Sequence, residues 1–281
     1  MLPVAWRFGQ PSPLPGFRLA LCGTLLWLAV IVLIPLGGVL LRSSSIGLAG
    51  IWEIATQPRL MAALRLSFGL SLLAGLFSLV VGLLIAWVLT RYDFPGSRFL
   101  DAAIDLPFAM PTAVAGIALT AVYAPNGWFG APLASLGLKV AYTPLGIFIA
   151  LVFIGLPFAV RTIQPVLAET EVELEEASAT LGATRAQTIR KVILPPLIPA
   201  ALTGLALSFA RAVGEYGSVI FIAGNIPFAS EIAPLMVVMK LEEFDETGAT
   251  AIAAIMLGVS FAMLLLINLV QAWTRRRLGH G

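Results

Sequence analysis

The sequence predicts an all-α membrane protein with six transmembrane helices. Of its 281 residues, 59% are hydrophobic and only 11% are charged, whereas a soluble domain carries roughly 25% charged residues. Lipid must therefore replace water around most of this chain. The second observation is that long apolar stretches recur along the sequence, each near the length of about 20 residues that one helical crossing of a bilayer requires.

Six stretches define the expected helices. They lie at residues 19–41, 64–90, 102–124, 143–163, 197–223 and 250–273. The first is too long for the apolar core of a signal peptide, so we expect it to be retained as a span. The third carries Pro107 and Pro111, which should bend or break its helix and free carbonyls that need protein or water partners. Residues 1–281 form a single domain in this interpretation, because no soluble domain or internal repeat interrupts the pattern.

The distribution of lysine and arginine predicts that both termini lie in the cytoplasm, where the loops of membrane proteins carry an excess of basic residues. Eleven of the 17 basic residues belong to the termini and to the loops on their side of the membrane. These are Arg7, Arg18, Arg91, Arg98, Arg161, Arg185, Arg190, Lys191, Arg275, Arg276 and Arg277. The opposite side has Arg42, Arg59, Arg65, Lys139 and Lys240, and Arg211 lies inside the fifth span.

The residue types exclude several chemistries. With one cysteine (Cys22) and one histidine (His280), the chain builds neither an internal disulfide nor a histidine-based catalytic or metal site. It contains no GxxxxGK[ST] phosphate loop for binding ATP. We therefore expect no catalytic residue, no metal, no cofactor and no nucleic-acid partner. A stand-alone secondary anion transporter and an intramembrane enzyme are the competing classes, but neither internal repeats nor catalytic pairs are apparent.

Residues 168–196 depart from the lipid-like pattern and are rich in glutamate. Thr170 followed by Glu173, and Thr184 followed by Gln187, each match a capping box at the start of a helix. The segment therefore predicts two short helices in a hairpin on the cytoplasmic side.

The ends of these two helices are also marked in the sequence. Gly182 suits a left-handed residue after the first helix, and Pro195 with Pro196 should stop the second. One face of the first helix carries small and apolar residues at helical spacing: Leu174, Ala177, Ser178 and Leu181. Two interpretations stay open, a loop packed on its own bundle and a knob that docks into a groove on a soluble partner.

The stretch Glu176-Ala177-Ser178, then Gly182, then Val192-Ile193-Leu194-Pro195 resembles the signature of ABC importer permeases. That pattern is Glu-Ala-Ala, three residues, Gly, nine residues, Ile-x-Leu-Pro; here Ser178 and Val192 are small departures and the spacing is intact. The resemblance implies a type I ABC importer permease fold whose loop docks on a cytoplasmic ATPase. The expected ATPase-coupling residues are Leu174, Glu176, Ala177, Ser178, Leu181, Gly182, Leu194 and Pro195.

Further segments resemble the T-type permeases of sulfate and thiosulfate import. They are TRYDFPG (90–96), DLPFAMPTAVAG (105–116), RTIQPVL (161–167), ALSFARAVGEYGSVIFIAGN (206–225) and LEEFD (241–245). Molybdate and tungstate permeases are the alternative, although they tend to have a second proline where this chain has Thr112. The resemblance implies a bacterial inner-membrane complex with a second, W-type permease, an ATPase dimer and a periplasmic sulfate/thiosulfate-binding protein, and it leaves heterodimer and homodimer open.

Three residues are candidates for the anion pathway. Arg211 and Glu215 are one helical turn apart in the fifth span, where a lone charge is costly. They either form a structural ion pair or place positive potential on the pathway. Thr112 follows the two prolines of the third span, and its hydroxyl either faces the pathway or bonds its own helix. The acidic residues from 242 to 246 form either a solvated loop or a contact for the binding protein.

Overall fold

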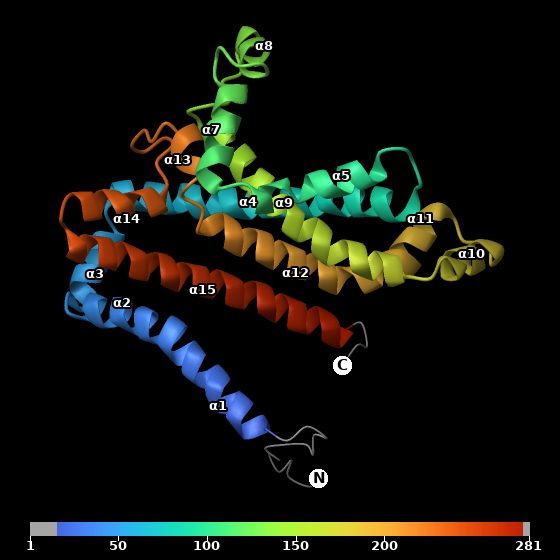
Figure 1. Cartoon of the computed structure of the whole chain (residues 1–281), viewed down its shortest axis with the longest axis horizontal. Coiled ribbons are helices and arrows are strands. Elements are labelled where there is room, and N and C mark those ends of the chain that lie inside the picture. The colour runs from blue at the N-terminus through green and yellow to red at the C-terminus, as the bar shows by residue number, and fades with distance from the viewer. Residues whose placement is uncertain (1–15, 278–281) are drawn as a thin grey trace.

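The computed structural model describes residues 16–277, all of whose regular structure is helical (Figure 1). Arg7 and His280 lie outside the described residues. The helices are α1 (Phe17–Leu28), α2 (Ile34–Ser44), α3 (Gly47–Ala55), α4 (Pro58–Arg91), α5 (Ser97–Ile104), α6 (Leu106–Ala109), α7 (Thr112–Tyr123), α8 (Gly130–Ser135), α9 (Pro144–Glu169), α10 (Val172–Thr180), α11 (Arg185–Thr188), α12 (Leu194–Val213), α13 (Val219–Ile222), α14 (Ala233–Glu242) and α15 (Glu246–Arg277). Two π-helical turns, Ala29–Leu33 and Ile189–Ile193, join α1 to α2 and α11 to α12.

The core of the bundle is formed by α4, α9 and α12, which pack along much of their lengths (Figure 1). The face that α4 buries is made largely of small residues. A Cβ added at Gly82 would lie 2.8 Å from the Cβ of Ala159 on α9, and one at Gly75 would lie 3.2 Å from Leu205 on α12. Helices in lipid associate through such close packing, because no hydrophobic force drives them together there.

Five helical segments of the described residues are long and apolar enough to cross a membrane: Leu19–Ser44, Pro58–Arg91, Pro144–Glu169, Arg185–Val213 and Glu246–Thr274. They correspond to five of the six predicted spans. The 34-residue α4 is about 50 Å long, well beyond the ~30 Å hydrocarbon core, so it must tilt or protrude.

The predicted third span, 102–124, is not one helix. It is divided into the end of α5, the single turn α6 and the 12-residue α7, which is about 18 Å long. The division follows from the prolines. Met110, which precedes Pro111, has an extended backbone (φ −91°, ψ 134°), as expected for a residue before proline.

The predicted fifth span, 197–223, is also interrupted. Its helix begins earlier, at Arg185 if the π-helical turn is included, and ends at Val213. Gly214 terminates α12, and a non-helical stretch leads to the short α13. Arg211 therefore lies in the last turn of α12, and Glu215 lies just beyond its end.

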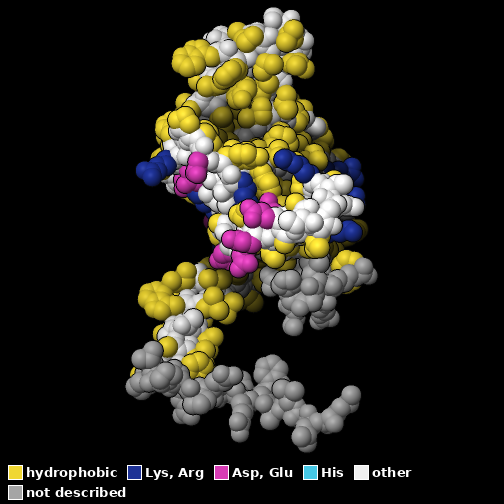
Figure 2. Space-filling model, turned by 90° about the vertical axis from the view of Figure 1, so that its right-hand side faces the viewer, with side chains coloured by type: hydrophobic (Ala, Val, Ile, Leu, Met, Phe, Trp, Pro, Cys, Tyr) yellow, Lys and Arg dark blue, Asp and Glu magenta, His cyan; other side chains and the backbone are white. Residues whose placement is uncertain are grey.

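Two parts of the chain extend away from the core. The segment Leu19–Ser44 buries none of its apolar window inside the protein, and its α2 half packs on α15. The arm made of α7 and α8 projects steeply from the bundle (Figure 1). Hydrophobic side chains cover this arm at the top of Figure 2, and its exposed residues include Trp128, Phe129 and Leu136.

Candidate functional site: a helical hairpin and two interrupted spans

The hairpin predicted at 168–196 is present, and its turn is a Schellman motif. Gly182 has φ +82°, a conformation that glycine adopts without steric cost. The Gly182 N–H donates to the Ala179 carbonyl and the Ala183 N–H donates to the Ser178 carbonyl, both at 3.0 Å. These two bonds satisfy carbonyls that the end of α10 would otherwise leave open. The sequence prediction for Gly182 is confirmed.

One of the two predicted capping boxes is confirmed. The Thr184 backbone N–H donates to the Gln187 side chain (2.8 Å), and the Gln187 N–H donates to Thr184 Oγ1 (3.4 Å). The other prediction is wrong, because α10 begins one residue later, with Glu171 at the N-cap and no side-chain cap. The Thr170 hydroxyl instead donates back to the Val166 carbonyl of α9 (2.9 Å).

The prediction that Pro195 and Pro196 stop the second helix is wrong. The helix continues from Arg185 to Val213. A π-helical turn over Ile189–Ile193 directly precedes α12, and proline stands at the first or second position of α12. Proline is tolerated in a first helical turn, where its missing N–H is not needed. As a result, the second leg of the hairpin is continuous with a core helix.

The predicted coupling residues lie in two groups. Leu181 is 88% exposed at the tip, with Leu174, Glu176 and Ala177 exposed along α10. Ser178 instead faces the second leg, where its hydroxyl lies 2.7 Å from that of Thr188. Leu194 and Pro195 belong to the first turn of α12, beyond the tip, and Leu194 is still partly exposed.

The hairpin also makes a contact that sequence reasoning missed. Arg91, the last residue of α4, donates to Glu175 Oε1 of α10 (2.7 Å) and to the Thr170 carbonyl (3.1 Å). Its guanidinium carbon lies 5.9 Å from the centre of the Trp87 ring. Figure 2, viewed from the hairpin end, shows acidic and basic side chains gathered there. The sequence offered little indication of this contact, because Arg91 at the end of a predicted span and Glu175 in the hairpin are 84 positions apart.

The two interrupted spans meet each other inside the bundle. A Cβ added at Gly217 would collide with the Thr112 hydroxyl at the start of α7, and one added at Gly116 would collide with the backbone of Ser218. These glycines allow α7 to approach the non-helical stretch after α12 closely. The structure thus brings Thr112 beside the segment that holds Glu215, which the sequence alone did not predict.

Arg211 and Glu215 form the ion pair that their spacing predicted. Arg211 Nη1 lies 2.5 Å from Glu215 Oε2, and the side chains are 35% and 2% exposed. The second oxygen of Glu215 accepts from both the N–H and the hydroxyl of Ser218, each at 2.9 Å. Glu215 therefore satisfies backbone freed by the helix break, as irregular structure at membrane depth requires.

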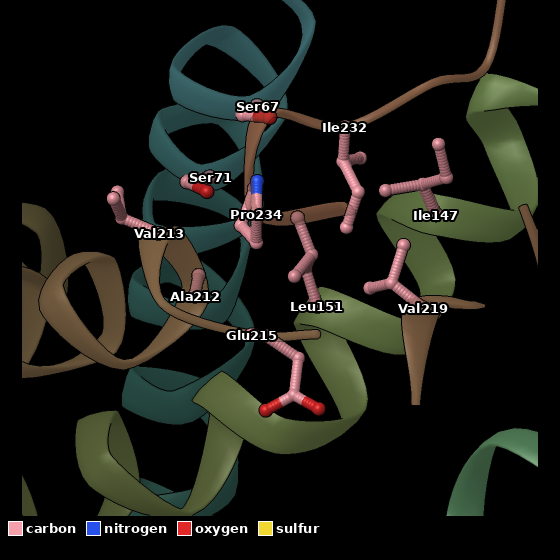
Figure 3. Close-up of a pocket in the computed structure, with 10 residues that line it drawn as sticks. All are labelled: Ser67, Ser71, Ile147, Leu151, Ala212, Val213, Glu215, Val219, Ile232 and Pro234. Atoms are coloured by element: carbon pink, nitrogen blue, oxygen red, sulfur yellow. The ribbon is translucent and has the colours of Figure 1, made fainter. Parts of the chain in front are cut away.

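Glu215 also lines the small cavity shown in Figure 3, with Ser67 and Ser71 of α4 on another wall. Its carboxylate points away from the two serines (Figure 3). The cavity holds about 10 Å³, which is the space of roughly one water molecule. It is too small for an oxyanion.

A polar cluster ties α5 to α9. Arg161 binds both carboxylate oxygens of Asp105 (2.9 and 2.7 Å) and also Asp101 and Gln164 (2.7 Å each). The hydrogen bond from Arg161 holds the pKa of Asp101 below its usual range. This cluster fixes the first piece of the broken third span against a core helix.

A second buried carboxylate was missed by the sequence analysis. Glu231, in the segment before α14, is 2% exposed and is held by Arg59 at the start of α4. The Arg59 Nε and Nη2 atoms donate to the two carboxylate oxygens at 2.8 and 2.6 Å. Nothing in the local sequence distinguishes Glu231 from a solvated loop residue, because its partner is 172 positions away.

The acidic residues from 242 to 246 are largely paired within the chain. Lys240 Nζ lies 2.9 Å from Glu243 and 3.3 Å from Asp245, and Glu246 pairs with Arg42. The hydrogen bond to Glu243 raises the pKa of Lys240, and the Gly248 N–H lowers that of Asp245. These contacts support the interpretation of a self-paired, solvated loop.

Several membrane-spanning helices, a hairpin with the permease signature and two interrupted spans define a transport permease. The chain belongs to the family of binding-protein-dependent transport system inner membrane components, whose model matches residues 78–280. It is 52% identical over 253 residues to the sulfate transport system permease protein CysT of Synechocystis, covering 90% of this chain and 88% of that relative. It is 48% identical over 268 residues to CysT of Escherichia coli, covering 95% and 97%.

Solved structures of ABC transporters share the fold. A bacterial ABC transporter involved in alginate import superposes with a TM-score of 0.74 at 16% identity, covering 91% of this chain and 94% of that chain. An inward-facing methionine ABC transporter superposes with a TM-score of 0.57 at 18% identity, covering 78% and 96%. The predicted fold class, an ABC importer permease, is confirmed. The chain is a multi-pass membrane protein and a transport subunit.

Proposed function

We propose that this chain is the permease subunit that carries sulfate and thiosulfate across the bacterial inner membrane in an ATP-driven importer. The observation that carries the proposal is the identity of about half of all aligned residues with sulfate permeases along nearly the whole chain. The chain lacks a phosphate loop, so a separate ATPase dimer supplies the energy. A periplasmic binding protein delivers the anion.

The hairpin is the surface we assign to the ATPase. Its tip exposes Leu181 and α10 exposes Leu174, and exposed apolar side chains that lie together on one surface suit docking on another protein. Its second leg is continuous with α12, so movement of that leg reaches one of the three core helices directly. Movement of a rigid helix against its neighbours is an established way of switching a bundle between two conformations.

The ATPase assignment predicts that Leu181→Arg prevents assembly. We expect the variant to fold but to lose co-purification with the ATPase and sulfate uptake, because a charge replaces the apolar tip. Leu48→Arg makes the same change at a leucine of α3 that is 87% exposed and lies at the opposite end of the bundle from the hairpin (Figure 1), so it should retain the ATPase. Glu176→Arg reverses a charge beside the tip and should also weaken assembly. Normal assembly and uptake with both hairpin variants would contradict the assignment.

The anion pathway passes the junction of the two interrupted spans. Discontinuous helices line substrate sites in other transporters, because their ends offer unsatisfied backbone groups. Arg211 supplies positive charge there, and its bond to Glu215 uses only one of five N–H donors. Thr112 adds a hydroxyl from α7. A weak set of contacts suits a pathway, because tight binding would slow release.

The pathway assignment predicts that Arg211→Met lowers sulfate uptake about ten- to hundredfold, the loss expected for a charge-assisted hydrogen bond. Assembly of the importer should survive, because the Glu215 carboxylate still accepts hydrogen bonds from the N–H and the hydroxyl of Ser218. Arg211→Lys preserves the charge and should retain part of the uptake. Uptake and assembly are measured together in each variant. Wild-type uptake by Arg211→Met would remove Arg211 from the pathway.

One permease of this kind is half of a pathway, and we assign the projecting arm to the other half. The arm of α7 and α8 exposes large apolar side chains and contains a helix too short to cross lipid alone. A second, W-type permease covering this arm in a heterodimer accounts for both features. The excess of basic residues on the hairpin side supports a cytoplasmic location for the hairpin and both termini.

A further inference from the structure

The two legs of the hairpin are attached to the bundle differently. The second leg, α11, continues through a π-helical turn into α12. The first leg, α10, is separated from α9 by Thr170 and Glu171, both extended (ψ 115° and 129°). A two-residue extended link has soft dihedral angles, so α10 could swing on it without any cost to either helix. Apart from its turn into the second leg and the contact of Ser178 with Thr188, side-chain contacts hold α10 in place against α9.

Arg91 is placed to hold that link. It is the final residue of α4, and its Nη2 atom bonds both the Thr170 carbonyl at the end of α9 and Glu175 on α10. The ion pair is largely shielded, with both side chains mostly buried. Hydrogen bonds to an ionised partner are about twice as strong as neutral ones. One guanidinium therefore joins α4, α9 and α10.

The neighbourhood of Arg91 restricts its side chain further. Trp87, one turn earlier on α4, lies under the guanidinium at 5.9 Å, and cation–π contacts of this kind add stability when they are desolvated. Among the described residues 16–277, no hydrogen-bond partner is found for the buried Arg91 Nε atom. Such a group carries a desolvation penalty, which an arginine free to turn toward solvent would avoid. The side chain is thus held in a costly position by its contacts.

We propose that Arg91 is a positioning residue that makes α10 move as one body with α4 and α9, so that ATPase movement at the hairpin reaches the transport pathway. The inference rests on the proposed function. Without this contact, a push on α10 bends the link at 170–171 and reaches the core only through α12. Hydrolysis then continues with little transport. Arg91 is therefore required for coupling, while ATPase docking depends on the exposed tip.

The test uses the whole importer, reconstituted in liposomes with its ATPase and binding protein, and measures labelled sulfate transported per ATP hydrolysed. For Arg91→Met we expect normal assembly, ATP hydrolysis close to wild type and a transport-to-hydrolysis ratio lowered about tenfold, a typical coupling energy between sites. Arg91→Lys keeps the charge and should restore part of the ratio. Arg98→Met, at an exposed arginine of the neighbouring α5, should leave it unchanged.

A distance measurement separates this inference from the proposed function. Spin labels at Tyr92→Cys and Thr180→Cys, both exposed positions, are introduced with Cys22→Ser, because Cys22 is an exposed free cysteine. The distance distribution should broaden when Arg91→Met or Glu175→Ala is added. Glu175→Ala provides the second test if Arg91→Met does not fold.

The outcomes are distinct. A narrow, unchanged distribution in both variants overturns the inference, as does a normal transport-to-hydrolysis ratio with a broadened distribution. Equal loss of assembly, thermal stability and transport in Arg91→Met and Arg91→Lys shows a merely structural role and overturns it as well. Failure of the wild-type chain to bind any ATPase instead overturns the proposed function, and it leaves the distance result to decide whether Arg91 holds α10.

Discussion

Replacing Arg59 with methionine is expected to lower the free energy of unfolding by about 3–5 kcal/mol, the cost of leaving a buried charge without its partner. Glu231 is only 2% exposed and receives two of its hydrogen bonds from Arg59. Without them the carboxylate must either stay charged in an apolar site or take up a proton. Thermal unfolding of the detergent-solubilised protein measures the change.

Replacing the carboxylate of the pair should lower the free energy of unfolding less than replacing Arg59. Glu231→Leu removes the buried charge itself, and Arg59, at 40% exposure, can turn toward solvent. The double variant Arg59→Met with Glu231→Leu should therefore be more stable than Arg59→Met alone. Arg42→Met is the matched control, because Arg42 and its partner Glu246 are both exposed and such pairs contribute about 0–1 kcal/mol. Equal effects of Arg59→Met and Arg42→Met would contradict the prediction.

Replacing Gly82 with leucine is expected to force α4 and α9 apart. A Cβ at this position would already lie 2.8 Å from Ala159 Cβ and 3.3 Å from the Val160 nitrogen, and the backbone of α9 cannot move aside as a side chain can. Overpacking of this kind costs about 1–3 kcal/mol and occasionally more. We expect a lower unfolding temperature, less folded protein in the membrane and a corresponding loss of uptake.

Gly69→Leu is the control for this prediction. Gly69 lies on the same helix, and a Cβ there would have no neighbour within 4 Å. The two variants share the change in helix propensity and in hydrophobicity, so their difference isolates the packing of α4 on α9. If both variants unfold at the same temperature, close approach at Gly82 does not stabilise the bundle.

The features predicted correctly from the sequence are those that depend on residues close together in the chain. Gly182 adopts the left-handed backbone that the turn after a helix requires, and the capping box of Thr184 and Gln187 spans only three positions. The pair of Arg211 and Glu215 follows from their separation by one helical turn. Apolar length likewise located five of the expected spans.

The effect of proline on the helices could not be predicted from the sequence alone. Proline was expected to end the helix at 195, but a π-helical turn placed it in a first turn, where it does no harm. Pro107 and Pro111 were expected to bend or break the third span, and they broke it, so that 102–124 is not one helix. Whether a proline kinks, ends or starts a helix depends on which partners the freed carbonyls find, and these are set by the neighbouring helices.

The ion pairs that hold distant segments together could not be predicted from the sequence. Arg91 pairs with Glu175 across 84 positions and Arg59 with Glu231 across 172, so no local pattern signals either contact. Hydropathy, helix caps and turn chemistry were enough to predict a multi-pass membrane protein with a helical hairpin, because each acts over a few residues, and the resemblance to a family signature added the expectation of a permease. Only the tertiary structure shows the junction of the two interrupted spans and the attachment of α10 to α4. Contacts of this kind form between residues that folding brings close together, however far apart they are in the sequence.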